Sequence, residues 1–398
     1  MTQPLLQAAD LRGGARLTTD AVAGLASLVE AMRVRLASLS PPTPADASHR
    51  REGRAAGPAG PGQGTVRGDE PLAAGGAEAM LGWLAPALAT ADPRQPSHPE
   101  HEAVVAALNG LLGDHLAATD NPLAITMAFR HAGARLPLER LALRARLQQP
   151  TPRLLVLLHG LCLNDLQWRR AGHDHAEALA RELGFTPIHL HYNTGLSIST
   201  NGRILAPLME NLYDAWPMPI QRLAMMGHGM GGLVARSAIH HGQLIQRGRL
   251  RWPARVGDLV CLGSPHLGAP FDQPGHGIDL LLGATPYAGP LARLGKLRSA
   301  GIDDLRRGNI VPGPAGDDGT QPCTPVGLPG DTRCFTVAAS LGEAGDGLVP
   351  VASALGQHQE PGRRLDFAPN RQAVVHDTSH LDLLSSPQVY SLLRQWLG

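Results

Sequence analysis

The stretch Gly227-His228-Gly229-Met230-Gly231-Gly232 decides the fold expected for this chain. An apolar run at 223–226 precedes it, and a helical pattern begins directly after it. A strand, a sharp turn and a helix in this order are typical of a nucleophile elbow, whose pattern is G-x-S-x-G. The outer glycines of the pattern are Gly227 and Gly231, whereas Gly229 stands in place of the central serine. The sequence therefore predicts an elbow that lacks the attacking hydroxyl.

Short apolar runs alternate with helical patterns on both sides of this elbow. The expected strands are 154–158, 187–192, 222–226, 256–262 and 334–339, and the expected helices follow Trp168 and cover 204–215, 230–241 and 387–397. This alternation predicts an α/β fold, with a mostly parallel sheet and helices on both of its faces. The functional residues of such sheets lie on loops at the carboxyl ends of the strands.

The loop after the first of these strands reads His159-Gly160-Leu161. Next to an elbow of this kind, the strand-end loop gives one backbone N–H to an oxyanion hole, and the residue after the nucleophile gives the second. Those donors would be Leu161 and Met230, each contributing ~3 kcal/mol to stabilisation of the transition state. Gly160 lets the backbone approach a substrate closely.

Two later loops carry an acid and a base. Asp346 lies between glycines soon after the strand 334–339, and His380 lies just before the last helix. The order elbow, Asp346, His380 matches the chain order Ser…Asp/Glu…His of hydrolases that use such an elbow. His376 is an alternative base close to His380 in the sequence.

Four segments together resemble bacterial α/β-hydrolases of the lipase and esterase class, and most of all their GPI inositol-deacylase-like branch. The resemblance covers about 150–398 and rests on Leu154-Leu155-Val156-Leu157-Leu158-His159-Gly160, on Gly227–Gly232, on Gly263-Ser264-Pro265-His266-Leu267-Gly268-Ala269-Pro270 and on Asp346-Gly347-Leu348-Val349-Pro350. Members of that class hydrolyse esters with a Ser-Asp-His triad. The resemblance therefore implies an ester hydrolase that needs no organic cofactor.

Carried over residue by residue, the resemblance gives each position a role. Asp346 would be the acid and His380 the base, and Leu161 and Met230 would supply the oxyanion donors. Loop support would come from His159, Gly160 and His228. The nucleophile position maps to Gly229, where the pattern fails.

Glycine has no side chain that can attack a carbonyl, so no acyl-enzyme can form at Gly229. Three interpretations of Gly229 stay open. The chain is an ester hydrolase scaffold inactivated at this position, with at most slow hydrolysis by water that His380 activates. Alternatively, it is a natural pseudo-hydrolase that binds a lipid, an ester or a protein partner. In the third reading Cys162 or Ser264 serves as a substitute nucleophile.

The N-terminal part, 1–149, matches none of these segments and is expected to be a helical extension of a hydrolase domain at 150–398. Helical patterns cover 18–37, 76–90 and 99–118, and a Pro/Gly-rich linker is expected at about 41–75. Within the hydrolase domain, residues 268–312 exceed a plain connection between strands. We expect them to form a cap, whose apolar residues either line an acyl or lipid pocket or simply pack on the sheet.

Composition and charge narrow the classes of partner that the chain is expected to bind. The 398 residues carry a formal net charge of +1, which does not suggest a nucleic-acid partner. No secretory signal and no apolar stretch of membrane-spanning length is evident, so we expect a cytoplasmic chain. The expected helix at 18–37 is not basic enough to support peripheral membrane contact.

The four cysteines are expected to be free thiols. Two histidine pairs, His173 with His175 and His189 with His191, have no third ligand with clear spacing, so no metal site is expected.

Overall fold

The structure is a computed structural model that describes residues 99–147, 149–245, 249–270, 299–313, 324–342 and 345–398. The chain divides after Ala87, and every described residue lies in the second part, Leu88–Gly398. The expected helices at 18–37 and 76–90, the linker at 41–75 and residues 271–298 of the expected cap lie outside the described residues.

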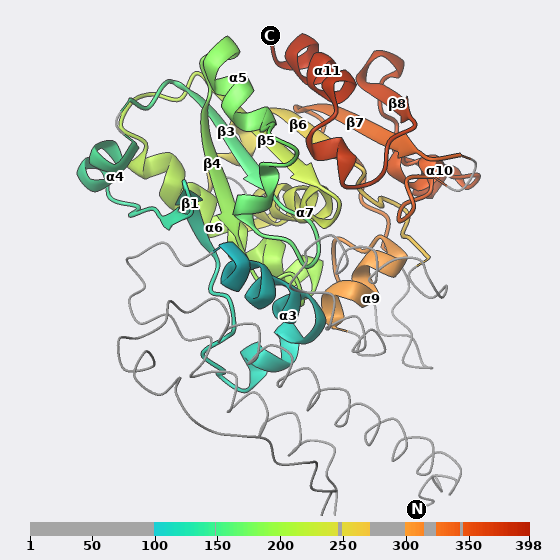
Figure 1. The fold of residues 1–398 in the computed structure, drawn as a ribbon, viewed down its shortest axis with the longest axis horizontal. Coiled ribbons are helices and arrows are strands. Elements are labelled where there is room, and N and C mark those ends of the chain that lie inside the picture. The colour runs from blue at the N-terminus through green and yellow to red at the C-terminus, as the bar shows by residue number, and fades with distance from the viewer. Residues whose placement is uncertain (1–98, 148, 246–248, 271–298, 314–323, 343–344) are drawn as a thin grey trace, which may run out of the picture. The chain divides into compact units, whose positions relative to one another are not determined.

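An eight-stranded sheet in the order β2-β1-β4-β3-β5-β6-β7-β8 forms the centre of the described structure (Figure 1). Strands β3 to β8 pair in parallel, and β1 and β2 add an antiparallel edge. The strands are β1 Ala128–His131, β2 Ala134–Arg135, β3 Arg153–Leu158, β4 Thr186–His191, β5 Arg222–His228, β6 Val256–Leu262, β7 Arg333–Ser340 and β8 Gln372–His376. The expected mostly parallel sheet is confirmed.

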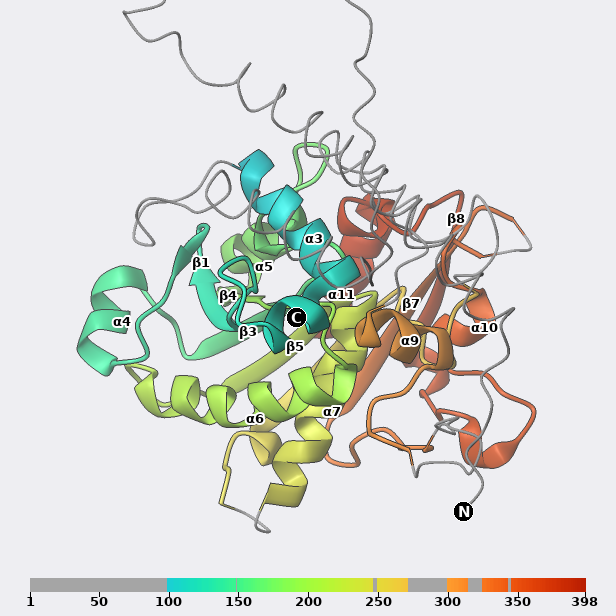
Figure 2. The ribbon, with the colours of Figure 1, turned by 90° about the horizontal axis from the view of Figure 1, so that it is seen from below.

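Helices cover both faces of this sheet (Figure 2). Helices α5 and α11 pack on one face, where they share a buried cluster with residues of β3, β5, β6 and β7. Helix α7 packs on β3, β5 and β6 and lies beside α6. Because successive strand residues point to opposite faces and α7 has no member in that cluster, α6 and α7 cover the other face. The α-helices are α3 Pro99–Ala118, α4 Arg140–Leu147, α5 His175–Leu183, α6 Ile198–Ala215, α7 Met230–Leu244, α9 Ala300–Arg307, α10 Val351–Ala354 and α11 Pro387–Leu397.

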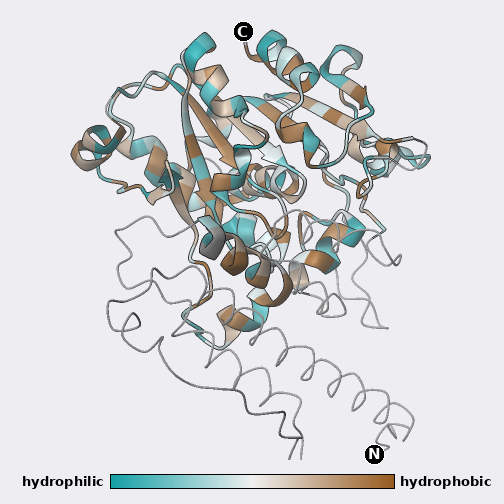
Figure 3. Cartoon of the chain, in the orientation of Figure 1, coloured by the Kyte–Doolittle hydropathy of each residue, from teal (hydrophilic) through white to brown (hydrophobic). Residues whose placement is uncertain are grey.

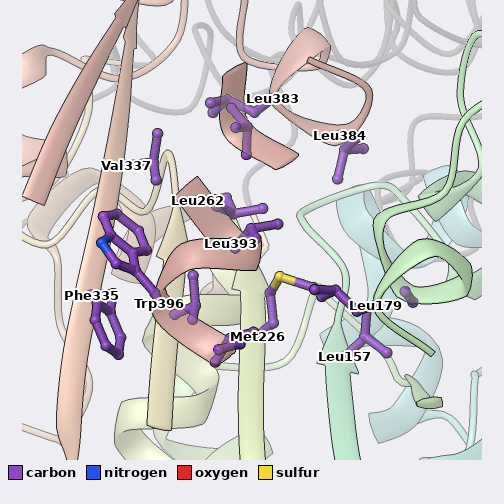
Figure 4. Close-up of a cluster of buried hydrophobic side chains, with 14 of the residues drawn as sticks. Leu157, Leu179, Met226, Leu262, Phe335, Val337, Leu383, Leu384, Leu393 and Trp396 are labelled. Atoms are coloured by element: carbon purple, nitrogen blue, oxygen red, sulfur yellow. The ribbon is translucent and has the colours of Figure 1, made fainter. Parts of the chain in front are cut away.

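Apolar side chains from strands and helices interdigitate in the cluster under α5 and α11 (Figure 4). The rings of Phe335 and Trp396 stack there with centroids 4.9 Å apart, and Met226 and Leu157 extend the cluster along the central strands. Helix α11 is amphipathic, with a mixed hydrophobic and hydrophilic surface (Figure 3), because Val389, Leu393 and Leu397 repeat at helical spacing. Burial of this stripe fixes the last helix on the sheet.

The expected elements at 99–118, 256–262 and 387–397 have the bounds that the sequence predicts. Helix α6 begins at Ile198, six residues before the expected start, because the Ser197 side chain caps it by accepting from Thr200 N–H. Strands β1, β2 and β8 were not foreseen. The first two lie within 1–149, so the sheet begins before residue 150, the expected start of the hydrolase domain.

Helix α3 packs tightly against the loops at the carboxyl ends of the strands. A Cβ on Gly110 would lie 2.3 Å from Cys162 Sγ, and one on Gly113 would lie 1.8 Å from Asn193 Oδ1. The Asn193 amide donates to the Gly113 carbonyl over 2.8 Å, and the Ser299 hydroxyl donates to the Gly110 carbonyl over 2.7 Å. Glycines in this helix therefore let a segment from the expected N-terminal extension form part of the hydrolase core.

Candidate active site

The elbow forms where β5 passes into α7. Gly229 has φ 53° and ψ −118°, a conformation that side-chain-bearing residues rarely adopt. Its N–H donates to the Leu262 carbonyl over 2.8 Å, and its own carbonyl accepts from Gly232 N–H. The chain therefore makes the sharp turn that the sequence predicts, with residue 229 at its tip.

The outer glycines of the elbow are required by close backbone contacts. A Cβ on Gly227 would lie 2.2 Å from Gly232 N, and one on Gly231 would lie 2.1 Å from the Leu158 carbonyl oxygen. Both contacts are shorter than a carbon atom allows. These glycines bring the first turn of α7 against the end of β3, and so bring the elbow next to the loop that starts at His159.

Asp346 and His380 meet beside the elbow, with His380 Nδ1 2.7 Å from Asp346 Oδ2. The other carboxylate oxygen accepts two backbone N–H groups, from Leu348 over 2.9 Å and from Val349 over 2.7 Å. Both side chains are buried. Because a carboxylate only accepts, Nδ1 carries the proton, and Nε2 is the free basic nitrogen.

His380 Nε2 is directed at the tip of the elbow. A Cβ built on Gly229 would lie 2.9 Å from Nε2 and 3.4 Å from Cε1 of His380, and its next neighbour is the Gly160 Cα at 3.8 Å. The structure thus brings together Gly229, Asp346 and His380. His376 ends β8 with an exposed side chain, and the ring that contacts Asp346 is that of His380.

The loop after β3 lies against the elbow and is held at its first residue. The Tyr192 hydroxyl donates to the His159 carbonyl over 2.7 Å, and the two rings stack with centroids 4.4 Å apart. Burial lowers the pKa of His159 to about 3, so its ring is neutral. Among the described residues, neither Leu161 N–H nor Met230 N–H donates a hydrogen bond in a turn, loop or cap.

His228 joins the three loops of the site. It is fully buried, its Nε2–H donates to the His380 carbonyl over 2.9 Å, and its ring lies 4.4 Å from that of His380. A Cβ on Gly160 would lie only 3.1 Å from His228 Nδ1. Burial lowers the pKa of His228 well below its usual value, so this contact does not titrate near neutral pH.

Cys162 and Ser264, the two possible substitute nucleophiles, lie in surroundings that do not favour nucleophilic attack. Cys162 is buried beneath α3, with Sγ 3.9 Å from the Ala107 carbonyl, and burial raises the pKa of its thiol to about 12. A thiol with that pKa supplies almost no thiolate at neutral pH. Ser264 is also fully buried, and its hydroxyl packs against Gly232 in the first turn of α7. In the described part of the chain, neither side chain forms a hydrogen bond with His380.

A second buried polar group, not foreseen from the sequence, is centred on Asp165, shortly after the loop that starts at His159. Asp165 Oδ1 lies 3.2 Å from both Arg130 Nη1 and His191 Nδ1, and Arg130 also pairs with Glu102 over 2.9 Å. Burial acts to raise the pKa of Asp165, but contact with His191 and the charge of Arg130 hold it at about 2. This group connects α3, β1, β4 and the turn Asp165–Trp168. No local pattern marks Asp165, because its partners are distant in sequence.

The histidine pairs lie outside any metal-like cluster. His173 Nε2 contacts His175 Nδ1 over 2.8 Å, and His175 Nε2 donates to the Leu383 carbonyl over 2.9 Å. Within the described ranges, no three His, Cys, Asp or Glu side chains are placed so that they could hold a metal ion. The described cysteines, Cys162, Cys261 and Cys334, are free.

Known proteins resemble the central part of the chain. The family model of the PGAP1-like alpha/beta domain matches residues 155–286, which include the loop that starts at His159 and the elbow and make up less than half of the chain. No curated protein sequence matches the chain. Among the helices that the structure describes, none is long and apolar enough to cross a membrane.

Solved structures of hydrolases are similar to the chain at low sequence identity. The mature lipase BlEst2 of Bacillus licheniformis is 18% identical, with a TM-score of 0.41 over 63% of this chain and 94% of that one. A lipase-esterase related protein of Clostridium acetobutylicum is 11% identical, with a TM-score of 0.38 over 68% and 99%. The RedJ thioesterase of Streptomyces coelicolor is 16% identical, with a TM-score of 0.36 over 64% and 92%.

The parallel sheet, the strand–elbow–helix unit at β5 and α7, and the matching family model agree on one architecture. The chain has an α/β-hydrolase fold.

Proposed function

We propose that this chain is an ester-hydrolase scaffold that binds carboxylic esters with acyl or lipid-like groups, and that Gly229 removes its covalent chemistry. One observation carries the proposal: the hydrogen-bonded pair Asp346–His380 presents its free nitrogen to the tip of the elbow. A buried carboxylate that orients a histidine toward a turn of this kind is the arrangement that activates a nucleophile in acyl transfer.

Each remaining part of the site has a role in that chemistry. The Leu161 and Met230 N–H groups would stabilise the negative charge on the tetrahedral intermediate. Asp346 would keep His380 in the tautomer that accepts a proton at Nε2 and would stabilise the imidazolium that follows. His159, Gly160 and His228 would hold the two loops in register. Only the attacking oxygen is missing at residue 229.

The second candidate function is non-catalytic binding of a lipid, an ester or a protein partner. Gly229 itself favours it, because a chain that only binds does not require a nucleophile. Asp346 and His380 favour the first candidate, since a pure binding site does not need an oriented base.

Restoring the side chain separates the two. We expect Gly229→Ser to hydrolyse p-nitrophenyl acetate, butyrate or laurate at least 10²-fold faster than the matched Gly229→Ala, which adds the same Cβ without a hydroxyl. Strong activity of the serine variant supports an inactivated hydrolase. If that variant is inactive but a fluorescent acyl ester still binds, the binding function is favoured. A folded Gly229→Ser protein that neither hydrolyses nor binds any of these esters contradicts the proposal.

A further inference from the structure

We propose that Thr194 is a positioning residue for the oxyanion donor Leu161, and that it acts by holding a strained turn at Cys162. The inference rests on the ester-hydrolase scaffold proposed above and deepens it, since it says what keeps one of the two expected donors aimed at a substrate carbonyl. Thr194 lies in the loop after β4, and no motif of the sequence singles it out.

The loop after β3 makes a tight turn over residues 160–163. The Leu163 N–H donates to the Gly160 carbonyl over 3.2 Å, which closes a four-residue β-turn. Cys162, the third residue of this turn, has φ 59°, whereas the φ of Leu161 is not positive. A positive φ at the third residue alone is typical of a type II turn, in which glycine is the favoured residue there. The cysteine is therefore held in a conformation that its side chain disfavours.

The Thr194 side chain accepts a hydrogen bond from this strained residue. Its Oγ1 lies 3.2 Å from the Cys162 N that donates to it, and both residues are buried. In a type II turn the middle peptide, here between Leu161 and Cys162, is turned over relative to the commoner type I form. An acceptor opposite the N–H of that peptide stabilises the type II orientation, and the Thr194 hydroxyl is placed as that acceptor.

Helix α3 packs on the side chain of the same residue. Cys162 Sγ lies 3.9 Å from the Ala107 carbonyl oxygen, and a Cβ on Gly110 would lie only 2.3 Å from it. A change of φ at Cys162 would redirect its Cα–Cβ bond and so would have to move this buried thiol against the helix. The backbone and the side chain of Cys162 are therefore both held in the strained form.

The peptide groups on either side of Leu161 are thus both fixed. Before it, the Tyr192 hydroxyl donates to the His159 carbonyl over 2.7 Å, and after it the Cys162 N–H donates to Thr194. With its neighbours held, the Leu161 N–H keeps one direction. Donors that are fixed before substrate binds require no reorganisation in the transition state. Thr194 therefore supports the rate through Leu161, without touching the substrate.

The experiment uses the full-length chain with the serine restored. In the Gly229→Ser background, we expect Thr194→Val to lower kcat for p-nitrophenyl butyrate by about 10²-fold, the loss that a misplacement of about 1 Å produces. Valine keeps the branched shape and removes the acceptor. KM should stay nearly unchanged, because an interaction made only in the transition state lowers kcat and kcat/KM equally. Thr194→Ser, which keeps the hydroxyl, should restore most of kcat.

The matched control is Thr332→Val in the same background. Thr332 is also buried, and its hydroxyl donates to the Val256 carbonyl over 3.0 Å. It precedes β7 and its acceptor begins β6, so it lies at the end of the sheet opposite the site. We expect this variant to lose a buried hydrogen bond and to keep kcat. Thermal melting of each variant checks that it is folded.

A double variant tests the link through the backbone of Cys162. Glycine adopts φ 59° without strain, so it needs less support from an acceptor. Adding Cys162→Gly to Thr194→Val, still in the Gly229→Ser background, should therefore recover kcat by about tenfold. A folded double variant no faster than Thr194→Val alone would overturn the proposed route through the turn.

The remaining outcomes separate this inference from the proposed function. If Gly229→Ser is active and folded Thr194→Val keeps its kcat, or if Thr332→Val loses as much, the positioning role is overturned and the scaffold stands. A raised KM with unchanged kcat in Thr194→Val would also overturn the positioning role, since it would indicate a contact with substrate. An inactive Gly229→Ser protein would remove hydrolysis from the proposed function, and this inference with it.

Discussion

At residue 229, glycine adds no side chain to the elbow and takes up its turn without backbone strain. The φ of 53° and ψ of −118° are accessible to glycine at little cost, whereas a residue with a Cβ is strained there. A side chain would also press on His380, which Asp346 holds in place. Under the proposed function, a catalytic serine at this point would therefore act at the expense of stability.

We expect both Gly229→Ser and Gly229→Ala to lower the free energy of unfolding by about 1–3 kcal/mol, the usual cost of a strained backbone conformation. Urea unfolding followed by circular dichroism measures the change. Gly327→Ala is the matched control, because a Cβ at that position meets nothing within 4 Å and its φ is not positive. If the two elbow variants were as stable as the Gly229 protein, strain would not explain the glycine.

At the scale of elements, the sequence predicts those with strong periodicity or a clear cap. Strands β3, β5 and β6 contain continuous apolar runs, whereas β4 includes two histidines and β7 is interrupted by Thr336. The loops after them follow from the parallel topology. Strands β1, β2 and β8 are short and carry polar residues, so no local pattern distinguishes them from loops. The contacts of α3 with the loops after β3 and β4 depend on Gly110 meeting Cys162 and Gly113 meeting Asn193, which no local pattern encodes.

Helix α3 should be sensitive to the smallest increase in size at Gly110. A methyl group there would lie 2.3 Å from Cys162 Sγ and 3.0 Å from Cys162 N, so the loop that carries Leu161 must shift. We expect Gly110→Ala to lower the free energy of unfolding by about 1–3 kcal/mol despite the better helix propensity of alanine. Denaturant unfolding measures this, with Gly330→Ala as a control in open space. Equal stability of the two variants would show that α3 does not depend on this close approach.

At the scale of the whole molecule, the candidate site comes from loops that the parallel topology brings together at the carboxyl ends of the strands. The loops that carry His159, Gly229 and Asp346 could be placed from the sequence because each follows a recognisable strand, and His380 could be placed because it precedes the last helix. The Asp165 group could not, since Glu102, Arg130 and His191 come from three separate elements. This group ties α3 and the antiparallel edge to the parallel sheet, so it should contribute to the stability of the described structure as a unit.

The Asp165 group predicts a pH dependence. The pKa of Asp165 is lowered to about 2 in the folded chain from an ordinary value of 3.8, so the carboxylate stabilises the fold above about pH 4 and loses that effect as pH falls through 2. We expect Asp165→Asn to cost about 2 kcal/mol at pH 7, and we expect the difference to shrink between pH 4 and pH 3. Urea unfolding across this range measures it. Asp366→Asn, at an exposed pair with Arg364, should change little, and a pH-independent loss in Asp165→Asn would contradict the assignment.

The central claim is that the Asp346–His380 pair is aligned on an elbow that lacks only its nucleophile. Intact-mass spectrometry after incubation with a fluorophosphonate tests it most directly, because this reagent bonds to a serine oxygen that a neighbouring histidine activates. We predict no adduct on the Gly229 protein, one adduct on Gly229→Ser, and strongly slowed labelling of Gly229→Ser combined with His380→Gln. A folded Gly229→Ser protein that stays unlabelled, or a Gly229 protein that gains the adduct, would contradict this account.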